Sequence, residues 1–288
     1  MTAPDAAAAP WDDPRVAALL ELALAEDLGA GDRTSEALVP PGTQARGRLR
    51  AKEPLVVCGL PLLGRIFDRL GRVRTTAHAA EGARAAAGDV LATVEGDARA
   101  LLAGERLVLN LLQHLAGIAT ATRACVDAVA GTKLVVRDTR KTLPGLRLLA
   151  KYAVRTGGGT NHRLGLDDAI LVKDNHLALG GGDVAAAVRT ARARWPALPL
   201  EVECRTLAEV RAALGAAPDL ILLDNMTPAD LRAAVALAGG RVPLEASGGI
   251  TAASLPAVAA TGVDYVAMGA LTHSVRAVDL HLKLEPRP

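Results

Sequence analysis

Apolar residues recur at helical spacing in two stretches of the first half of the chain. Pro14 to Asp27 has apolar residues three and four positions apart, with a proline near its start and Gly29 as a stop. Ala100 to Val129 has leucines at four-residue steps from Leu107 to Leu115, which fall on one face of a helix. Both stretches are therefore predicted helices.

Between these helices the hydrophobic pattern changes to a period of two. Gln44 to Val57 alternates and predicts a strand, and Arg72 to Glu95 predicts short strands separated by glycine turns. A short helix is predicted at Pro61 to Leu70, and a loop at EDLGAGDRTSEAL, residues 26–38. The polar face of the first strand carries four cations, Arg46, Arg48, Arg50 and Lys52. We interpret this face as solvated sheet surface, with a binding role as the alternative.

The second half of the chain alternates short apolar runs with helical segments. The apolar runs are residues 134–136, 169–172, 200–204, 220–223, 242–246 and 264–268. The helices predicted between them are Leu146–Arg155, Val184–Arg194, Leu207–Leu214, Pro228–Leu237 and Ala252–Ala260. Repeated strand-then-helix units with apolar strands indicate a parallel sheet, open or closed into a barrel.

Composition narrows the possible functions. Aromatic residues make up only 2% of the 288 residues, so the stacking platforms of single-strand nucleic-acid binders are absent, and the formal charge is only +2. No run of ~18 apolar residues predicts a membrane span. The three cysteines are far apart, which disfavours a zinc site or a disulfide framework. With no signal-peptide pattern at the start, we expect a cytoplasmic protein.

Positive charge is concentrated in one stretch, Arg137 to His176. It contains eight lysines and arginines, two histidines and only four carboxylates, with a triple glycine at Gly157 to Gly159. Because the whole chain is nearly neutral, this local excess predicts a site for an anionic small molecule that carries phosphates or carboxylates.

Polar residues also stand at or just after the end of nearly every strand of the second half. They are Asp138, Arg140 and Lys141, then Lys173, Glu203, Asp224, Ser247 to Gly249, and Gly269 with Ala270. In an α/β barrel the loops after the strands form the active face. The alternative, that each residue is an isolated ion pair or helix cap, is weaker, because all of them share one position, the end of a predicted strand.

Two late loops are candidates for a phosphate site. SGGI leads into the predicted helix at 252–260, and MGALTHS follows the next strand. Glycine backbone N–H groups and a helix N-terminus both favour an anion, and His273 is a further possible donor. Glu203 and Asp224 are candidates to hold ribose hydroxyls or Mg²⁺, with an ion pair to Lys173 or Lys141 as the alternative.

The segments TRKTLPGLRLLAKYAVRTGGGTNHR, LVKDNH, EVEC, LLDNM, EASGGI and GVDYVAMGALTHS together resemble the quinolinate phosphoribosyltransferase family. The resemblance begins near EDLGAGDRTS and covers almost the whole chain. It implies an α/β fold made of an N-terminal α/β sandwich and an irregular, incomplete seven-stranded α/β barrel. The implied boundaries are 11–116 for the sandwich, rejoined by 276–288, and 117–275 for the barrel.

The resemblance implies transfer of phosphoribose from phosphoribosyl pyrophosphate to quinolinate with decarboxylation, giving nicotinate mononucleotide, pyrophosphate and CO₂ for NAD biosynthesis, with Mg²⁺ as cofactor. It implies a homodimer, or a hexamer built from dimers, in which Arg106 reaches the partner's site. Lys141, Glu203 and Asp224 are the implied catalytic residues, and the two carboxylates would assist the metal. The implied substrate-binding residues are Arg106, Thr139, Arg140, Lys141, His162, Arg163, Lys173, Glu203, Asp224, Ser247, Gly248, Gly249, Met268, Gly269, Ala270, Leu271 and His273.

Three alternatives remain open from the sequence. The first is a related phosphoribosyltransferase that acts on another heterocyclic acid. The second is a barrel aldolase that forms a Schiff base through Lys141 or Lys173. The third is a ligand sensor without catalytic activity.

Overall fold

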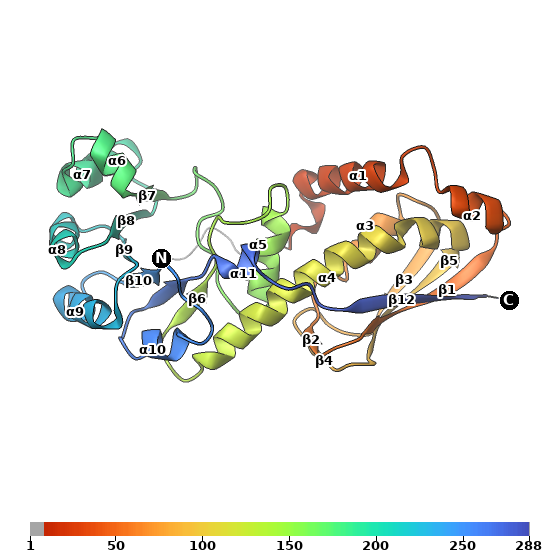
Figure 1. Ribbon diagram of the computed structural model, residues 1–288. Coiled ribbons are helices and arrows are strands. Elements are labelled where there is room, and N and C mark those ends of the chain that lie inside the picture. The colour runs from red at the N-terminus through yellow and green to blue at the C-terminus, as the bar shows by residue number, and fades with distance from the viewer. Residues whose placement is uncertain (1–8, 288) are drawn as a thin grey trace. The chain divides into compact units, whose positions relative to one another are not determined.

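The computed structural model describes residues 9–287 (Figure 1). The described chain divides into two compact units. The N-terminal unit comprises the residues through Arg123, the segment Leu143–Gly158 and the chain from Ser274 onward. The second unit comprises Ala124–Thr142 and Gly159–His273.

The N-terminal unit contains a four-stranded antiparallel sheet in the order β12-β1-β5-β3. Its strands are β1 (Gln44–Ala51), β3 (Val73–Ala77), β5 (Val90–Asp97) and β12 (Leu280–Pro286), and a separate pair is formed by β2 (Leu55–Val56) and β4 (Arg84–Ala85). The helices of this unit are α1 (Pro14–Leu28), α2 (Arg33–Leu38), α3 (Leu62–Phe67), α4 (Ala98–Ala128) and α5 (Arg147–Thr156), preceded by a 3₁₀ turn η1 (Pro10–Asp12). The end of the chain thus returns to pair with β1.

Local sequence accounts for the main elements of the N-terminal unit. Asp13 caps α1 by accepting from the backbone N–H of Arg15, and Gly29 ends the helix at a φ of 51°. In β1 every second residue is buried, and the cations between them lie on the more exposed face. This alternation is the predicted one, but the expected single strand 44–57 is broken into β1 and β2.

One loop prediction in the N-terminal unit is wrong. Residues 26–38 contain the end of α1 and the whole of α2, in addition to the turn between them. Asp32 caps α2 by accepting from the backbone N–H of Ser35. The capping aspartate and the glycines suggested a loop in the sequence, although an aspartate is also a typical first residue before a helix.

The second unit contains a six-stranded parallel sheet in the order β6-β11-β10-β9-β8-β7. Its strands are β6 (Val135–Arg137), β7 (Ile170–Val172), β8 (Leu200–Cys204), β9 (Leu220–Asp224), β10 (Leu244–Ser247) and β11 (Tyr265–Ala267). Its helices are α6 (Asp174–Leu179), α7 (Val184–Arg194), α8 (Leu207–Ala216), α9 (Pro228–Ala238), α10 (Leu255–Ala259) and α11 (Ala270–His273). All six predicted strands are present, within a few residues of their expected ends.

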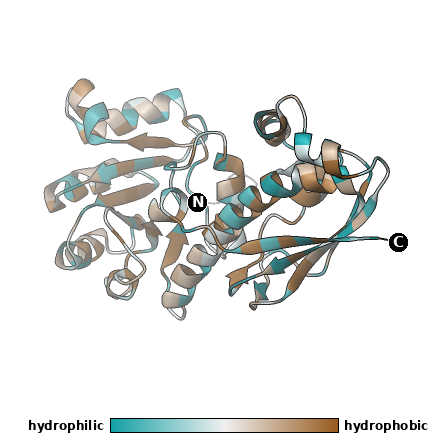
Figure 2. Cartoon of the chain, turned by 45° about the vertical axis from the view of Figure 1, so that its right-hand side comes forward, coloured by the Kyte–Doolittle hydropathy of each residue, from teal (hydrophilic) through white to brown (hydrophobic). Residues whose placement is uncertain are grey.

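The strands of this sheet are mostly hydrophobic, whereas the helices display hydrophilic residues on one side (Figure 2). The strand-then-helix order confirms the predicted α/β class with a barrel-like arrangement. Where a seventh strand was expected, the described residues show one isolated parallel bridge between Arg137 and Thr160. The predicted helix 252–260 is shorter than expected, because α10 begins only at Leu255.

Two further expectations concern the chain as a whole. Among residues 9–287, no helix is both long enough and apolar enough to cross a bilayer. The three cysteines, Cys58, Cys125 and Cys204, are buried thiols without a disulfide. Burial raises the pKa of the Cys204 thiol to about 12, so this group is a core residue rather than a nucleophile.

Candidate active site

The predicted site residues of the second unit come together because its strands are parallel. Lys173 directly follows β7, Glu203 lies near the end of β8, Asp224 ends β9 and Ser247 ends β10. The carboxyl ends of neighbouring parallel strands lie at the same edge of a sheet. The polar residues predicted at the strand ends therefore lie along one edge of the sheet, where carboxylates, cations and glycine turns are neighbours.

The acidic part of this edge is a cluster of three carboxylates and two cations. Lys173 Nζ lies 3.6 Å from Glu203, and Arg205 lies 3.6 Å from Glu203, 3.4 Å from Asp224 and 2.7 Å from Asp174. The side chains of Glu203 and Asp224 are only 9% and 16% exposed. Oxygen donors of this kind fit a hard divalent cation such as Mg²⁺.

A glycine turn allows the loops after β9 and β10 to pack closely against each other. Gly248 has a φ of +96°, and a Cβ there would lie 2.2 Å from Asn225 Oδ1. The backbone N–H of Asn225 in turn donates to Ser247 O at 2.9 Å. Only glycine fits at this position, so the approach of the two loops depends on it.

The predicted helix N-terminus beside this glycine turn is not there. The sequence led us to expect SGGI to open directly into a helix, but five residues separate Gly249 from α10, and no side chain caps α10. Any anion at Gly248 and Gly249 would therefore be bound by the backbone N–H groups of the turn itself and not by a helix dipole.

The second glycine loop lies against Lys141. A Cβ at Gly269 would be 2.9 Å from Lys141 Cδ and 3.0 Å from His273 Nε2, so both side chains pass close to this glycine. Thr272 Oγ1 donates to the backbone oxygen of Lys141 at 2.8 Å, and the Lys141 N–H donates to Thr139 Oγ1 at 3.0 Å. Lys141, Gly269 and His273 thus form one cationic corner of the edge. Met268 and Leu271 are buried, so they offer backbone groups only.

Two arginines form a second cationic group. Burial and the neighbouring Arg140 guanidinium lower the pKa of Arg163, while Glu201 and Asp168 act in the opposite direction. Arg163 Nη1 donates to Ala169 O at 3.0 Å, which fixes one side of its guanidinium. Two like charges held close together and partly desolvated are well suited to an anion that binds both.

A buried polar cluster lies next to Arg163 and is formed by Arg137, His162, Glu201 and Glu245. Arg137 Nη1 donates to Glu245 Oε2 at 2.5 Å, and His162 Nε2 lies 2.8 Å from Glu201 Oε2 and 3.5 Å from Glu245 Oε1. His162 Nδ1 accepts from the backbone N–H of Arg163 at 2.7 Å. Both ring nitrogens of His162 therefore have partners within the protein, one of them the backbone that carries Arg163.

Burial makes the two carboxyl groups of this cluster hold protons at unusually high pH. Desolvation raises the pKa of Glu201 from 4.5 to about 7, against the attraction of Arg137 and Arg163. Desolvation and the charge of Glu201 raise the pKa of Glu245 from 4.5 to about 7, against Arg137 and His162. At neutral pH the pair therefore shares protons.

This shift predicts a pH dependence of stability. Because the pKa in the folded state is raised, the pair stabilises the fold fully below pH 4.5, and this stabilisation is lost as the pH rises through about 7. In Glu201→Gln the pKa of Glu245 should fall, so the free energy of unfolding should change less between pH 5 and pH 8. Urea unfolding at several pH values measures this, with Glu26→Gln on the exposed face of α1 as the control. Equal slopes in all three proteins would contradict the prediction.

Glu201 and Glu245 were not predicted as members of the site, and Arg137 was noted only as the first cation of the stretch Arg137 to His176. Glu201 lies two residues before Glu203 on β8, and residues two apart point to the same face of a strand. That spacing was a usable signal. Glu245 gave none, because it stands as one polar residue in an apolar run, and its pairing with Arg137 across the sheet is a matter of tertiary structure.

Some predicted residues belong to the N-terminal unit. Arg106 lies on an exposed face of α4, next to Leu102, which is 36% exposed. Its predicted role across a subunit interface stays a prediction. Lys151 of α5, one of the eight cations of the stretch Arg137 to His176, also belongs to this unit and is only 3% exposed.

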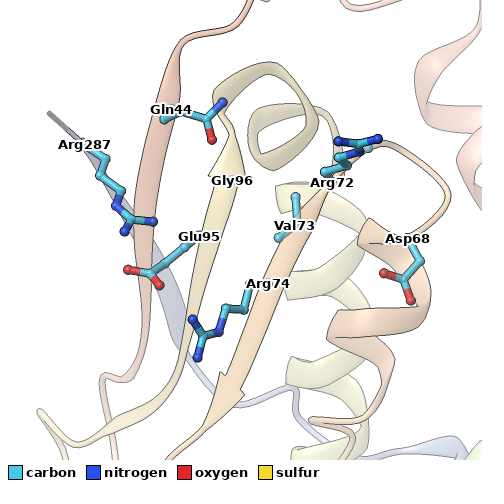
Figure 3. A pocket seen from close by; sticks show the side chains of 9 residues that line it. Gln44, Asp68, Arg72, Val73, Arg74, Glu95, Gly96 and Arg287 are labelled. Carbon is cyan, nitrogen blue, oxygen red and sulfur yellow. The ribbon is translucent and has the colours of Figure 1, made fainter.

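The N-terminal unit also has a hollow of about 450 Å³ along β3 and β5 (Figure 3). Its charged lining residues are Asp68, Arg72, Arg74, Glu95 and Arg287. Glu95 is paired with Arg46 at 2.5 Å, and this hydrogen bond and the nearby arginines lower its pKa. The hollow contains none of the predicted site residues, and we assign it no part in the chemistry.

Comparison with known proteins gives concordant results. Residues 32–116 match the model of the quinolinate phosphoribosyl transferase N-terminal domain, and residues 118–283 match that of the C-terminal domain. The chain is 49% identical to the carboxylating nicotinate-nucleotide pyrophosphorylase of Mycobacterium leprae, over 91% of this chain and 94% of the relative. It is similar to the solved nicotinate-nucleotide pyrophosphorylase of Francisella tularensis, with a TM-score of 0.92, 35% identity and coverage of 99% and 100% of the two chains.

Proposed function

The chain belongs to the quinolinate phosphoribosyltransferase family, and we propose how its site performs that family's reaction. The enzyme transfers phosphoribose from phosphoribosyl pyrophosphate to quinolinate and releases pyrophosphate and CO₂, giving nicotinate mononucleotide. One observation carries the assignment of roles: Arg140, the paired carboxylates and two glycine loops stand at the carboxyl edge of one parallel sheet, and the charge of Arg140 acts on Arg163.

Quinolinate has two carboxylates, and the paired arginines are their natural partners. The planar guanidinium of Arg163 and that of Arg140 can each bind a carboxylate through two N–H groups. Lys173 adds a point charge at the end of β7. His162 helps to position Arg163, because its imidazole accepts a hydrogen bond from the Arg163 backbone N–H. Quinolinate would thereby offset the repulsion between the two guanidinium groups, which adds to burial in lowering the pKa of Arg163.

Phosphoribosyl pyrophosphate fits the remainder of the edge. The 5′-phosphate would bind at the backbone of Ser247 to Gly249 and at the loop Met268 to Leu271, with Thr139, Lys141 and His273 nearby. Glu203 and Asp224 would hold the ribose hydroxyls and assist Mg²⁺. When bound, Mg²⁺ would offset the negative charge of the pyrophosphate.

The chemistry follows from the placement of these charges. As the bond from C1 of the ribose to the pyrophosphate breaks, positive charge develops on the ribose, and Glu203 and Asp224 stabilise it. Lys141 stabilises the negative charge on the leaving group. The pyridine nitrogen then forms its bond to C1, and the quaternised ring accepts the electron pair left when CO₂ departs. A proton then replaces the carboxylate on the ring. Positioning and fixed charge supply most of the rate acceleration.

Substrate choice tests this function directly. With phosphoribosyl pyrophosphate and Mg²⁺, we expect nicotinate mononucleotide from quinolinate and no turnover of nicotinate, because nicotinate lacks the carboxylate that the second arginine binds. Mass spectrometry of the products decides. Turnover of nicotinate without turnover of quinolinate would contradict the assignment and favour a related phosphoribosyltransferase.

We further propose that the enzyme is a cytoplasmic homodimer, or a hexamer of such dimers. Its two sequence domains would meet at residues 116 and 117, within α4 and a few residues before the end of the compact N-terminal unit. Arg106 would complete the partner's quinolinate site. The support is the exposure of this arginine on α4 beside a partly exposed leucine. An arginine in such a surround is well placed to enter a neighbouring anion site.

The shared site predicts complementation between two inactive proteins. Arg106→Ala and Glu203→Ala should each lose most activity, because one lacks the donated arginine and the other lacks its ribose carboxylate. After subunit exchange, mixed dimers should regain one working site of two, up to about one quarter of wild-type activity in an equal mixture. Activity is measured before and after exchange, and native mass spectrometry verifies the exchange. No recovery despite exchange would remove Arg106 from the partner's site.

A further inference from the structure

Arg205 is the one cation of the acidic cluster that the proposed mechanism leaves without a role. It stands between β8 and α8, and its side chain is 54% exposed. Its guanidinium reaches carboxylates from three adjacent strand ends, namely Asp174 after β7, Glu203 on β8 and Asp224 on β9. Two of these three carboxylates are the ones proposed to hold the ribose and to assist Mg²⁺.

The backbone of Arg205 is held at the start of α8, whereas its side chain is exposed to solvent. The Arg205 N–H donates to Glu209 Oε2 at 2.6 Å, and Thr206 begins α8 with a capping box that also uses Glu209. A long side chain on a fixed backbone can move between neighbouring partners at little cost in free energy.

The distances show which partner anchors the guanidinium. The contact with Asp174 is an ion pair at 2.7 Å, the shortest of the three. The guanidinium lies 3.6 Å from Glu203, and its Nε donates a long hydrogen bond of 3.4 Å to Asp224, so both contacts are weak. Arg205 is thus held by the outer carboxylate and only loosely attached to the two inner ones.

The charges of the cluster give the guanidinium a function. Asp174, Glu203 and Asp224 contribute three negative charges, and Lys173 contributes one positive charge. Without Arg205 the cluster has a net charge of −2, which a divalent cation would neutralise. Arg205 places one positive charge beside the same carboxylates that a bound divalent cation would neutralise.

We propose that Arg205 is an internal counter-cation for Glu203 and Asp224, which the metal complex of phosphoribosyl pyrophosphate displaces when it binds. The guanidinium then stays on Asp174 alone. Before the substrate binds, the Arg205 guanidinium holds Glu203 and Asp224 in place. The metal complex must therefore compete with this arginine for the two carboxylates. The inference rests on the proposed roles of Glu203 and Asp224.

Mn²⁺ binding without substrate tests this competition independently of catalysis. Mn²⁺ serves as the probe for the divalent cation, and electron paramagnetic resonance measures its free and bound forms. Arg205→Met keeps the length of the side chain and removes its charge, so Mn²⁺ should bind about two- to fivefold more tightly, the range expected for an exposed ion pair. Arg205→Lys retains the charge and should bind Mn²⁺ much as the wild type does.

A matched control lies at the opposite end of β8. Arg192 pairs with Asp219 at 2.6 Å, and Asp219 accepts from the N–H of Leu200 at the start of that strand. Arg192→Met removes an arginine from a partly exposed ion pair of the same unit, and it should leave Mn²⁺ affinity unchanged. Circular dichroism verifies that each variant is folded.

Steady-state kinetics completes the test. In Arg205→Met the KM for phosphoribosyl pyrophosphate at fixed, limiting Mg²⁺ should fall by a similar factor while kcat stays at the wild-type value. Equal Mn²⁺ affinity in wild type and Arg205→Met, including no binding by either, would overturn the inference. So would a tenfold loss of kcat at unchanged KM, which would place Arg205 on the leaving group instead. Failure of the wild type to use quinolinate would refute the proposed function and leave the Mn²⁺ comparison valid.

Discussion

Arg163→Ala is expected to lower kcat/KM for quinolinate by about 100-fold or more. A hydrogen bond to a charged group contributes roughly 1.5–3 kcal/mol, and a guanidinium that grips a carboxylate makes two of them. Arg163 is partly buried, and its pKa is lowered by burial and by Arg140. The loss therefore leaves a substrate carboxylate in a partly desolvated site with one arginine fewer.

The conservative variant separates charge from geometry. Arg163→Lys keeps a positive charge but not the planar fork, so it should recover only part of the lost activity. Arg211→Ala, on the exposed face of α8, is the control and should behave as the wild type. Steady-state kinetics with quinolinate varied at saturating phosphoribosyl pyrophosphate provides the measurement. Wild-type kcat/KM in Arg163→Ala would remove this arginine from the site.

Glu203→Gln is expected to reduce kcat by about 10²–10³-fold, with a smaller effect on the KM for quinolinate. The substitution keeps the shape of the side chain and removes the charge that stabilises the developing positive charge on the ribose. Losses of this size are typical when one preorganised electrostatic group of an active site is removed. Glu203 is only 9% exposed, so water screens its charge poorly.

The third carboxylate of the same cluster provides the comparison. Asp174 is 46% exposed and pairs with Arg205 rather than with a group proposed to touch the ribose. Asp174→Asn should therefore lower kcat by less than about tenfold, because exposed ion pairs contribute little. Pre-steady-state measurement of pyrophosphate release isolates the first chemical step. Equal losses in Glu203→Gln and Asp174→Asn would mean that the cluster acts through its overall charge and that Glu203 has no special position.

The order of elements in the second unit was predictable because its pattern is strongly periodic. The predicted helix 184–194 agrees with α7 at both ends, and strand 200–204 agrees with β8. The errors lie where local signals are ambiguous. Asp32 and the glycines before it are typical of loops, yet the aspartate caps α2. The stretch after Gly249 looked helical throughout, but its first residues form turns and α10 is short.

The charged residues at the strand ends were the most predictable part of the site. Lys173, Glu203 and Asp224 were found because each ends or follows an apolar strand, which is a feature of one segment at a time. The Arg137–Glu245 ion pair joins residues that are 108 positions apart in the chain, and no local sequence pattern predicts it. Arg205 was missed for a similar reason, since a long side chain that spans three strand ends depends on the order of strands in the sheet.

Release of labelled CO₂ tests the central claim most directly. Quinolinate labelled in the carboxylate next to the ring nitrogen is incubated with the enzyme, with and without phosphoribosyl pyrophosphate and Mg²⁺. We predict one labelled CO₂ for each nicotinate mononucleotide and each pyrophosphate, and none when phosphoribosyl pyrophosphate is omitted, because the ring must be quaternised before it accepts the electron pair. Nucleotide formation with the label retained, or CO₂ release without phosphoribosyl pyrophosphate, would contradict the account.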